Sequence, residues 1–157
     1  MFGFFKKKPI VIVSISNGKI VELEDVKDEV FSQKLAGDGV AIIPLDGTIV
    51  APVDGVISRI FPTNHAFSMT TKDNLEVLVH IGLDTVELKG KGFTVLEKEG
   101  NRVKANTPII DVDLEYLKSQ GKDTITPILV NSEKDITINS KNIGVVKRGD
   151  SIFEVSF

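Results

Sequence analysis

Apolar and β-branched residues occur along this chain in short runs, each bounded by glycine, proline, asparagine or aspartate. Short runs of this kind between turn-forming residues are typical of β-strands. They lie within residues 10–23, 40–61, 75–83, 92–98, 107–114, 124–131, 135–139 and 143–157, and a further strand begins at Ala66. About ten short strands in one chain predict an all-β fold, an antiparallel β-sandwich or barrel-like hybrid.

Three dipeptides mark turns between these runs. Asn17-Gly18 predicts a two-residue hairpin, because both residues tolerate the positive φ that such a turn requires. Asp46-Gly47 and Asp54-Gly55 predict two further turns. The pattern leaves room for short helical turns only: residues 25–39 could hold one or two, and residues 113–121 another that ends before Gly121.

The length of 157 residues suits a single domain with a substantial core. We expect that domain to span residues 10–157, after a flexible leader at residues 1–9. In the leader the phenylalanines precede the lysines, an order opposite to that of a secretion signal, and we therefore expect a cytoplasmic protein. At most, residues 1–8 would touch an anionic membrane surface.

Charge and composition exclude several classes of function. The net charge of −3 provides no basic surface for nucleic acid. The chain has no cysteine, which rules out disulfides, thiolate metal sites and cysteine nucleophiles. Candidate chemistry therefore centres on the two histidines, His65 and His80.

His80 lies at the end of the predicted strand "LEVLVHIG". Side chains alternate between the two faces of a strand, so Val77 and Val79 share the deep face while Leu78 and His80 share the more accessible one. Fifteen positions separate His80 from His65, which leaves room for two strands and a turn. The two imidazoles could thus be neighbours on adjacent strands, although two unrelated structural histidines are the commoner arrangement.

Three kinds of site compete for these histidines. A zinc hydrolase could combine them with Asp84 or Glu76, but the chain offers no third histidine and no HExxH motif. A swinging-arm carrier needs a lysine at a hairpin tip beside methionine, and neither Lys72 nor Lys141 has that setting. A phosphohistidine carrier needs one nucleophilic imidazole, a nearby donor and a docking rim, all of which the sequence can supply. A non-catalytic regulatory β-sandwich with incidental histidines is the remaining alternative.

Five segments, in this order and spacing, carry a resemblance to a known family: "LAGDGVAI", "APVDGVISRIF", "PTNHAFSM", "LVHIGLDTVELKG" and "EGNRVKANTPII". They resemble the glucose-type enzyme IIA of the bacterial phosphoenolpyruvate-dependent sugar phosphotransferase system. The likeness extends from about Val11 to the end of the chain. It implies an antiparallel β-sandwich with two adjacent histidines in an apolar surround.

The resemblance also implies roles. By motif position, His80 accepts a phosphoryl group on Nε2 from the histidine-containing phosphocarrier protein and passes it to a cysteine in the IIB domain of a sugar permease. His65 supports the phosphoryl oxygens, and Thr63 orients His65. Residues matching the docking rim are Asp28, Phe31, Phe61, Leu78 and Asp84. At Leu78 the family pattern has an aromatic residue.

Further expectations concern cofactors and chemistry. The resemblance implies no obligatory cofactor, and His65 and His80 could complete a zinc site with a carboxylate from a partner protein. We also expect a monomeric chain. For His80 to attack phosphorus its imidazole must be neutral. A hydrogen bond from its other nitrogen to a carbonyl or carboxylate would fix the tautomer, and the backbone at Gly82 is accessible for this.

Overall fold

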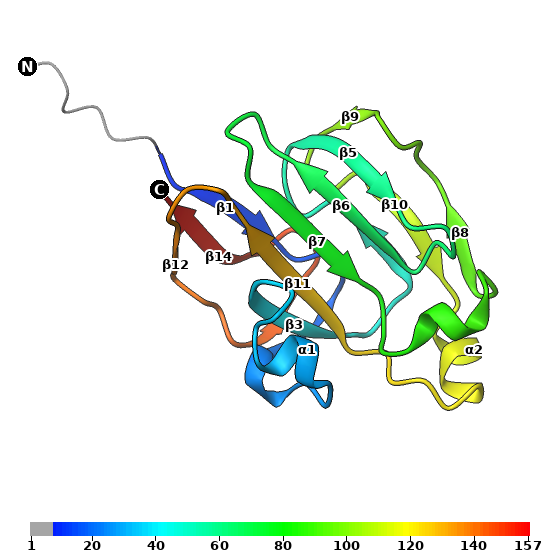
Figure 1. Cartoon of the computed structure of the whole chain (residues 1–157). Coiled ribbons are helices and arrows are strands. Elements are labelled where there is room, and N and C mark those ends of the chain that lie inside the picture. The colour runs from blue at the N-terminus through cyan, green and yellow to red at the C-terminus, as the bar shows by residue number, and fades with distance from the viewer. Residues whose placement is uncertain (1–7) are drawn as a thin grey trace, which may run out of the picture.

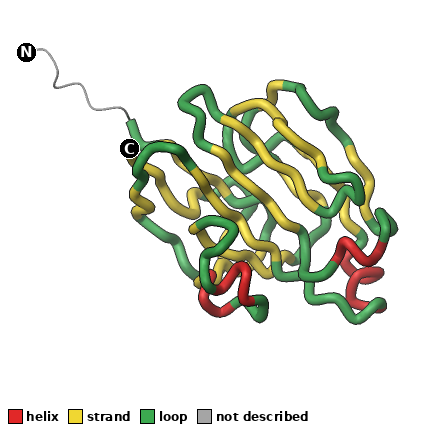
Figure 2. The backbone as a smooth tube through the Cα atoms, viewed as in Figure 1, coloured by secondary structure: helices red, strands yellow, loops and turns green. Residues whose placement is uncertain are grey.

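The computed structural model describes residues 8–157 (Figure 1). The strands of this part of the chain are β1 (Ile10–Val13), β2 (Gly18–Glu22), β3 (Asp38–Pro44), β4 (Thr48–Val50), β5 (Gly55–Ile60), β6 (Ala66–Thr70), β7 (Glu76–His80), β8 (Phe93–Val95), β9 (Arg102–Val103), β10 (Pro108–Val112), β11 (Thr126–Asn131), β12 (Thr137–Asn139), β13 (Gly144–Val146) and β14 (Ser151–Ser156). The helical segments are η1 (Leu23–Asp25), α1 (Glu29–Ser32), η2 (Thr85–Leu88) and α2 (Leu114–Ser119). Figure 2 shows these segments at the periphery of a body made of strands and loops.

The strands form one large and two small antiparallel sheets. The large sheet has the order β13-β2-β3-β11-β7-β6-β5-β9, and the small sheets have the orders β1-β14-β12 and β4-β10-β8. In Figure 1, β7 crosses the front of the molecule between β6 and β11, and pairs with both. Strand β1 pairs with β14, which brings the two ends of the described chain together.

The main core fills the space between the large sheet and the small sheets. Ile128 and Val79 from the large sheet join Ile110 and Phe153 from the small sheets in one buried cluster. Burying apolar area of this kind is the main favourable contribution to folding. The predicted antiparallel β-sandwich is therefore confirmed.

A second, smaller core covers the outer face of the large sheet. In β11, Ile128 belongs to the main core, whereas its neighbour Leu129 packs on the opposite side with Leu23 and Phe31. Alternation along the strand thus buries both faces of the sheet at its centre. The outer core fixes α1 against the sheet, and this is the face on which His80 lies.

The hairpin predicted at Asn17-Gly18 is wrong. The strands on either side belong to different sheets, because β1 pairs with β14 while β2 pairs with β3 and β13. A Cβ atom at Gly18 would lie 2.3 Å from the carbonyl oxygen of Ile43. Glycine is needed here for close strand approach rather than for a positive φ.

The other two predicted turns do lie at bends of the chain, but they connect strands of different sheets. Asp46-Gly47 joins β3 to β4, and Asp54-Gly55 joins β4 to β5. Because β4 lies in a small sheet while β3 and β5 lie in the large one, both turns carry the chain between sheets. The predicted helical turns are confirmed as η1 with α1 and as α2.

The leader predicted at residues 1–9 falls almost entirely outside the described residues, which begin at residue 8. The separate status of a leader and a domain at residues 10–157 stays a prediction. Within residues 8–157, no helix has the length and apolar character needed to span a membrane.

Candidate functional site

The two histidines lie side by side on a β-hairpin. Strands β6 and β7 pair so that Ala66 stands opposite His80, and the Ile81 N–H donates to the His65 carbonyl at 2.7 Å. The ring centroids of His65 and His80 are 5.0 Å apart, with the ring planes at 79°. Ala66, between His65 and the rest of β6, is fully buried.

The predicted orientation of His80 is confirmed. Val77 and Val79 are fully buried, whereas Leu78 and His80 on the opposite face are half-buried. The ring of His80 donates from Nδ1–H to the carbonyl oxygen of Gly82 at 2.8 Å. That bond assigns the proton to Nδ1 and leaves the lone pair of Nε2 free.

Gly82 makes this contact possible through its backbone conformation. Its φ is +75°, in the left-handed region that glycine adopts without strain. A Cβ atom there would also lie 2.6 Å from Thr85 Cγ2 and 2.9 Å from the Asp123 carbonyl. The sharp turn after β7 directs the Gly82 carbonyl back to the imidazole ring.

His65 is held more deeply, with 6% of its surface exposed. Its Nδ1 lies 2.5 Å from the hydroxyl of Thr63, two positions earlier. When the hydroxyl donates to Nδ1, the ring proton resides on Nε2. Phe61 meets the same ring edge-on, with centroids 5.8 Å apart.

Burial lowers the pKa of both histidines. Desolvation, and next the charge of His80, lower the pKa of His65 to about 4. The pKa of His80 is also lowered, chiefly by desolvation, while the Gly82 carbonyl and the carboxylates of Asp28 and Asp84 oppose that shift. Both imidazoles are therefore neutral near pH 7.

The predicted rim residues gather around the pair. Phe31 lies with its ring centroid 5.0 Å from that of His80 and packs in the outer core with Leu78. Asp28 caps α1 by accepting from the Val30 N–H, and Asp84 precedes η2. Both carboxylates raise the pKa of His80, so they lie near its ring. Glu76, the other carboxylate considered for a zinc site, begins β7 and is far from the histidines.

Three residues on or beside the elements that carry the site are not predicted from the sequence. Val30 and Val86 are 48% and 52% exposed, next in sequence to Phe31 and to the Asp84 turn. A helical segment of four residues is too short to show a hydrophobic period, so the sequence does not indicate that these valines are exposed. Arg59 lies over the face of Phe61, its guanidinium carbon 4.2 Å from the ring centroid. Nothing in the local sequence indicates that contact.

The site can offer a zinc ion two nitrogen ligands. Both Nδ1 atoms are already hydrogen-bonded, so the free positions are the Nε2 atoms of His65 and His80. Residues 8–157 contain no cluster of three or more His, Cys, Asp or Glu side chains that could hold a metal. Zinc normally takes four ligands, so the remaining ones would have to come from a partner or from water.

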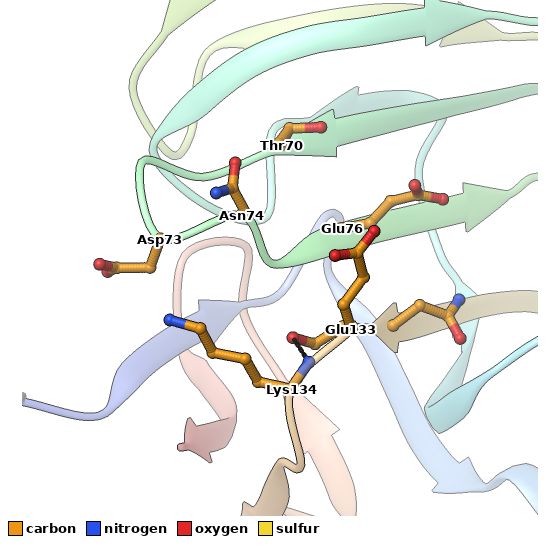
Figure 3. Close-up of a pocket in the computed structure, with 8 residues that line it drawn as sticks. Thr70, Asp73, Asn74, Glu76, Glu133 and Lys134 are labelled. Atoms are coloured by element: carbon orange, nitrogen blue, oxygen red, sulfur yellow. Dashed lines mark hydrogen bonds between the residues drawn. The ribbon is translucent and has the colours of Figure 1, made fainter.

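A polar cleft of about 600 Å³ lies elsewhere on the molecule. Figure 3 shows its lining, which includes Thr70, Glu76, Glu133 and Lys134. Glu76 begins β7 and His80 ends it, roughly 13 Å away at the rise of a β-strand. The cleft is thus at the opposite end of the hairpin from the paired histidines.

The fold and the site together define a class: an antiparallel β-sandwich whose outer sheet face carries two neutral, hydrogen-bonded imidazoles in an apolar surround flanked by two carboxylates. Residues 10–136 match the family described as "phosphoenolpyruvate-dependent sugar phosphotransferase system, EIIA 1". The chain belongs to this family.

Individual relatives agree with that assignment. The chain is 48% identical over 154 residues to the "PTS system glucose-specific EIIA component" of Haemophilus influenzae, covering 97% of this chain and 93% of that protein. It is 43% identical over 145 residues to the "PTS system glucose-specific EIICBA component" of Staphylococcus carnosus, 22% of whose length it spans. The solved "glucose permease IIA from Mycoplasma capricolum" superposes with a TM-score of 0.90 at 36% identity, covering 99% of both chains.

Proposed function

We propose that this chain is a phosphohistidine carrier of sugar uptake. His80 accepts a phosphoryl group from the histidine-containing phosphocarrier protein and passes it to a cysteine in the IIB domain of a sugar permease. The observation that carries this proposal is the hydrogen bond from His80 Nδ1–H to the Gly82 carbonyl. It leaves Nε2 as an outward lone pair beside a second imidazole.

In the acceptance step, Nε2 of His80 attacks phosphorus as the donor's P–N bond breaks. The electron pair of that bond returns to the donor imidazole, so no proton has to move. Charge builds up on the equatorial phosphoryl oxygens of such a loose transition state. His65, with its proton on Nε2, supplies a hydrogen-bond donor to those oxygens, and Thr63 keeps the proton there.

The phosphorylated ring carries a formal positive charge because Nδ1 keeps its proton. The Gly82 carbonyl and the carboxylates of Asp28 and Asp84 favour a charged His80 ring. They therefore stabilise the phosphohistidine after transfer. In the next step the acceptor thiolate attacks phosphorus, the P–N bond breaks, and its electrons restore neutral His80.

The apolar surround protects the bond between these two steps. Phe31 packs at His80 and Phe61 at His65, and Leu78 lies on the same face. Excluding water strengthens the hydrogen bonds to phosphate and slows hydrolysis of the phosphohistidine. A rim of apolar side chains with Asp28 and Asp84 suits brief docking of partners that present basic residues.

The names of the relatives support finer assignments. Glucose-specific proteins appear among the full-length and the fused relatives, so we assign glucose to the permease served by this chain. The EIICBA protein joins the same domain to permease parts, which supports the IIB domain as acceptor. We further propose that the chain acts in the cytoplasm as a monomeric phosphotransferase component.

The test is a phosphorylation assay with phosphoenolpyruvate, the upstream proteins and the histidine phosphocarrier. The proposal predicts an adduct that is labile in acid and stable in base, and that disappears when the IIB domain is added. A chain with incidental histidines would form no adduct, and that result would reject the carrier function.

Zinc binding between His65 and His80 is a second candidate role. Nδ1 of each ring is occupied by a hydrogen bond, so Nε2 is the ring nitrogen that can bind zinc. On His80 it carries a lone pair, and on His65 it would have to lose its proton. A partner carboxylate would supply a third ligand. Calorimetric titration of a partner with and without zinc tests this role, and equal affinities would contradict it.

A further inference from the structure

A β-bulge in β5 places two side chains on the face that carries the histidines. In the pairing of β5 with β6, Ile57 stands opposite Met69 and Arg59 opposite Ser68, so the register shifts between Ile57 and Arg59. In a regular strand these two residues would share a face. Instead, Ile57 is fully buried in the main core while Arg59 is exposed.

The bulge also decides where the following residues point. Ile60 packs against the main core, and Phe61 turns outward onto His65. Bulges commonly redirect a side chain next to a functional site. Here the bulge brings Arg59 and Phe61 to the same side of the sheet, where the guanidinium covers the ring face at 4.2 Å.

The loop before β9 pins this irregular end of β5. The Ile60 N–H donates to the carboxylate of Glu99 at 2.9 Å, and the Gly100 N–H donates to the Ile57 carbonyl at 2.7 Å. Glu99 therefore supplies the acceptor that a regular neighbouring strand would have supplied. The backbone that carries Arg59 and Phe61 is held on both sides.

Arg59, Phe61, His65 and His80 contact one another in that order. Arg59 covers Phe61, the Phe61 ring meets His65 edge-on at 70°, and His65 meets His80 at 79°. Thr63 fixes only one atom of the His65 ring, and the terminal torsion of an aromatic side chain is otherwise broad. The edge-on contact with Phe61 therefore limits rotation of the His65 ring, and the guanidinium of Arg59 over the Phe61 ring limits rotation of Phe61.

We propose that Arg59 is a positioning residue for phosphoryl transfer, which holds Phe61 against His65 so that His65 keeps its edge-on orientation to His80. The proposal rests on the carrier function. An exposed cation over an aromatic ring contributes a modest interaction. Losing it should slow transfer at saturating donor by about two- to fivefold.

The test compares Arg59→Met with Arg102→Met. Arg102 is exposed on the neighbouring strand β9, so its replacement removes the same charge without removing a ring contact. Arg59→Lys retains a cation and should transfer at a rate closer to that of the unmodified chain. Thermal unfolding of each variant confirms that its fold is intact.

Two readouts separate positioning from docking. The first measures the phosphorylation rate at several donor concentrations, which gives the rate at saturating donor and the KM for the donor. The second follows the nitrogen and proton NMR signals of the His65 ring in the absence of any partner. We expect Arg59→Met to lower the saturating rate and shift the His65 signals, and Arg102→Met to change neither.

Several results would overturn the proposal. An Arg59→Met variant with only a raised, salt-dependent KM would make Arg59 a docking charge, and unchanged His65 signals would show that it holds nothing in place. If the unmodified chain forms no phosphate adduct, the carrier function fails instead. The His65 signals then still report whether Arg59 orients the ring.

Discussion

His65 and His80 face each other with ring centroids 5.0 Å apart and ring planes at 79°. Each ring is fixed at Nδ1 by a partner two positions away in its own strand region, Thr63 for His65 and Gly82 for His80. When the Thr63 hydroxyl donates to His65, the two Nε2 atoms have opposite roles: that of His65 carries a proton and that of His80 a lone pair. This asymmetry is what a carrier needs from two chemically identical side chains.

Replacing Thr63 by valine tests how this asymmetry is maintained. The substitution preserves the shape of the side chain and removes the hydroxyl that contacts His65 Nδ1. A neutral hydrogen bond contributes about 1 kcal/mol, so we expect transfer to slow by about fivefold. Stopped-flow measurement of phosphorylation checks this, with Thr63→Ser as the control that keeps the hydroxyl. Equal rates in Thr63→Val and the unmodified chain would argue that Thr63 does not act through the tautomer of His65.

His65→Gln separates acceptance from onward transfer. The amide can still donate to a phosphoryl oxygen, but it lacks the ring nitrogen that contacts Thr63. We expect the variant to retain slow acceptance from the phosphocarrier and to lose most transfer to the IIB domain. Following the adduct in both half-reactions measures each step. Rapid onward transfer by His65→Gln would contradict a role for His65 in transition-state stabilisation.

The low pKa of His65 makes stability depend on pH. The folded state has a pKa of about 4 at this residue, against about 6.5 in the unfolded chain. Between these values the unfolded state binds more protons, so stability rises with pH. From pH 7 to pH 5 we expect a loss on the order of 2 kcal/mol from this residue.

Urea unfolding at both pH values measures that loss. His65→Gln removes the titrating group, and the fall in stability from pH 7 to pH 5 should be smaller in that variant. The same fall in both proteins would show that His65 is not the source. The pKa of His80 is also lowered, so His80 likewise makes stability fall as the pH falls. This contribution remains in the unmodified chain and in His65→Gln.

Ala66 stands next to His65 in sequence and opposite His80 in the pairing of β6 and β7. It is fully buried opposite His80, and Phe61 donates its N–H to the Ala66 carbonyl at 3.0 Å. Ala66→Val would add two methyl groups to a filled site, which costs about 1–3 kcal/mol of stability. We expect a lower melting temperature together with slower transfer. Ala66→Gly serves as the control that adds no volume, and normal transfer by Ala66→Val would show that the spacing of the rings is not critical.

Much of the site follows from sequence because alternation in a strand is a local property. The placement of Val77, Val79 and His80 needs only the period of two, and the hairpin that returns His65 to His80 needs only strand length. Gly82 has no side chain and follows His80 by two positions, so its accessible backbone can also be predicted locally. Its carbonyl accepts the hydrogen bond from His80.

Other features depend on partners distant in sequence. The role of Gly18 is decided by Ile43 on another strand, so a local turn signal gives the wrong hairpin there. The irregular end of β5 donates the Ile60 N–H to Glu99, 39 positions later in the chain. Without that bulge, alternation would place Arg59 on the same face as Ile57, inside the core. Contacts of this kind have no local signature.

Intact-mass measurement after incubation with phosphoenolpyruvate and the upstream proteins shows whether His80 is the phosphoryl acceptor. The unmodified chain should gain about 80 Da, and His65→Gln should gain the same mass more slowly. His80→Ala should gain nothing while keeping its fold by circular dichroism. A phosphate adduct on His80→Ala would show that another residue accepts the phosphoryl group.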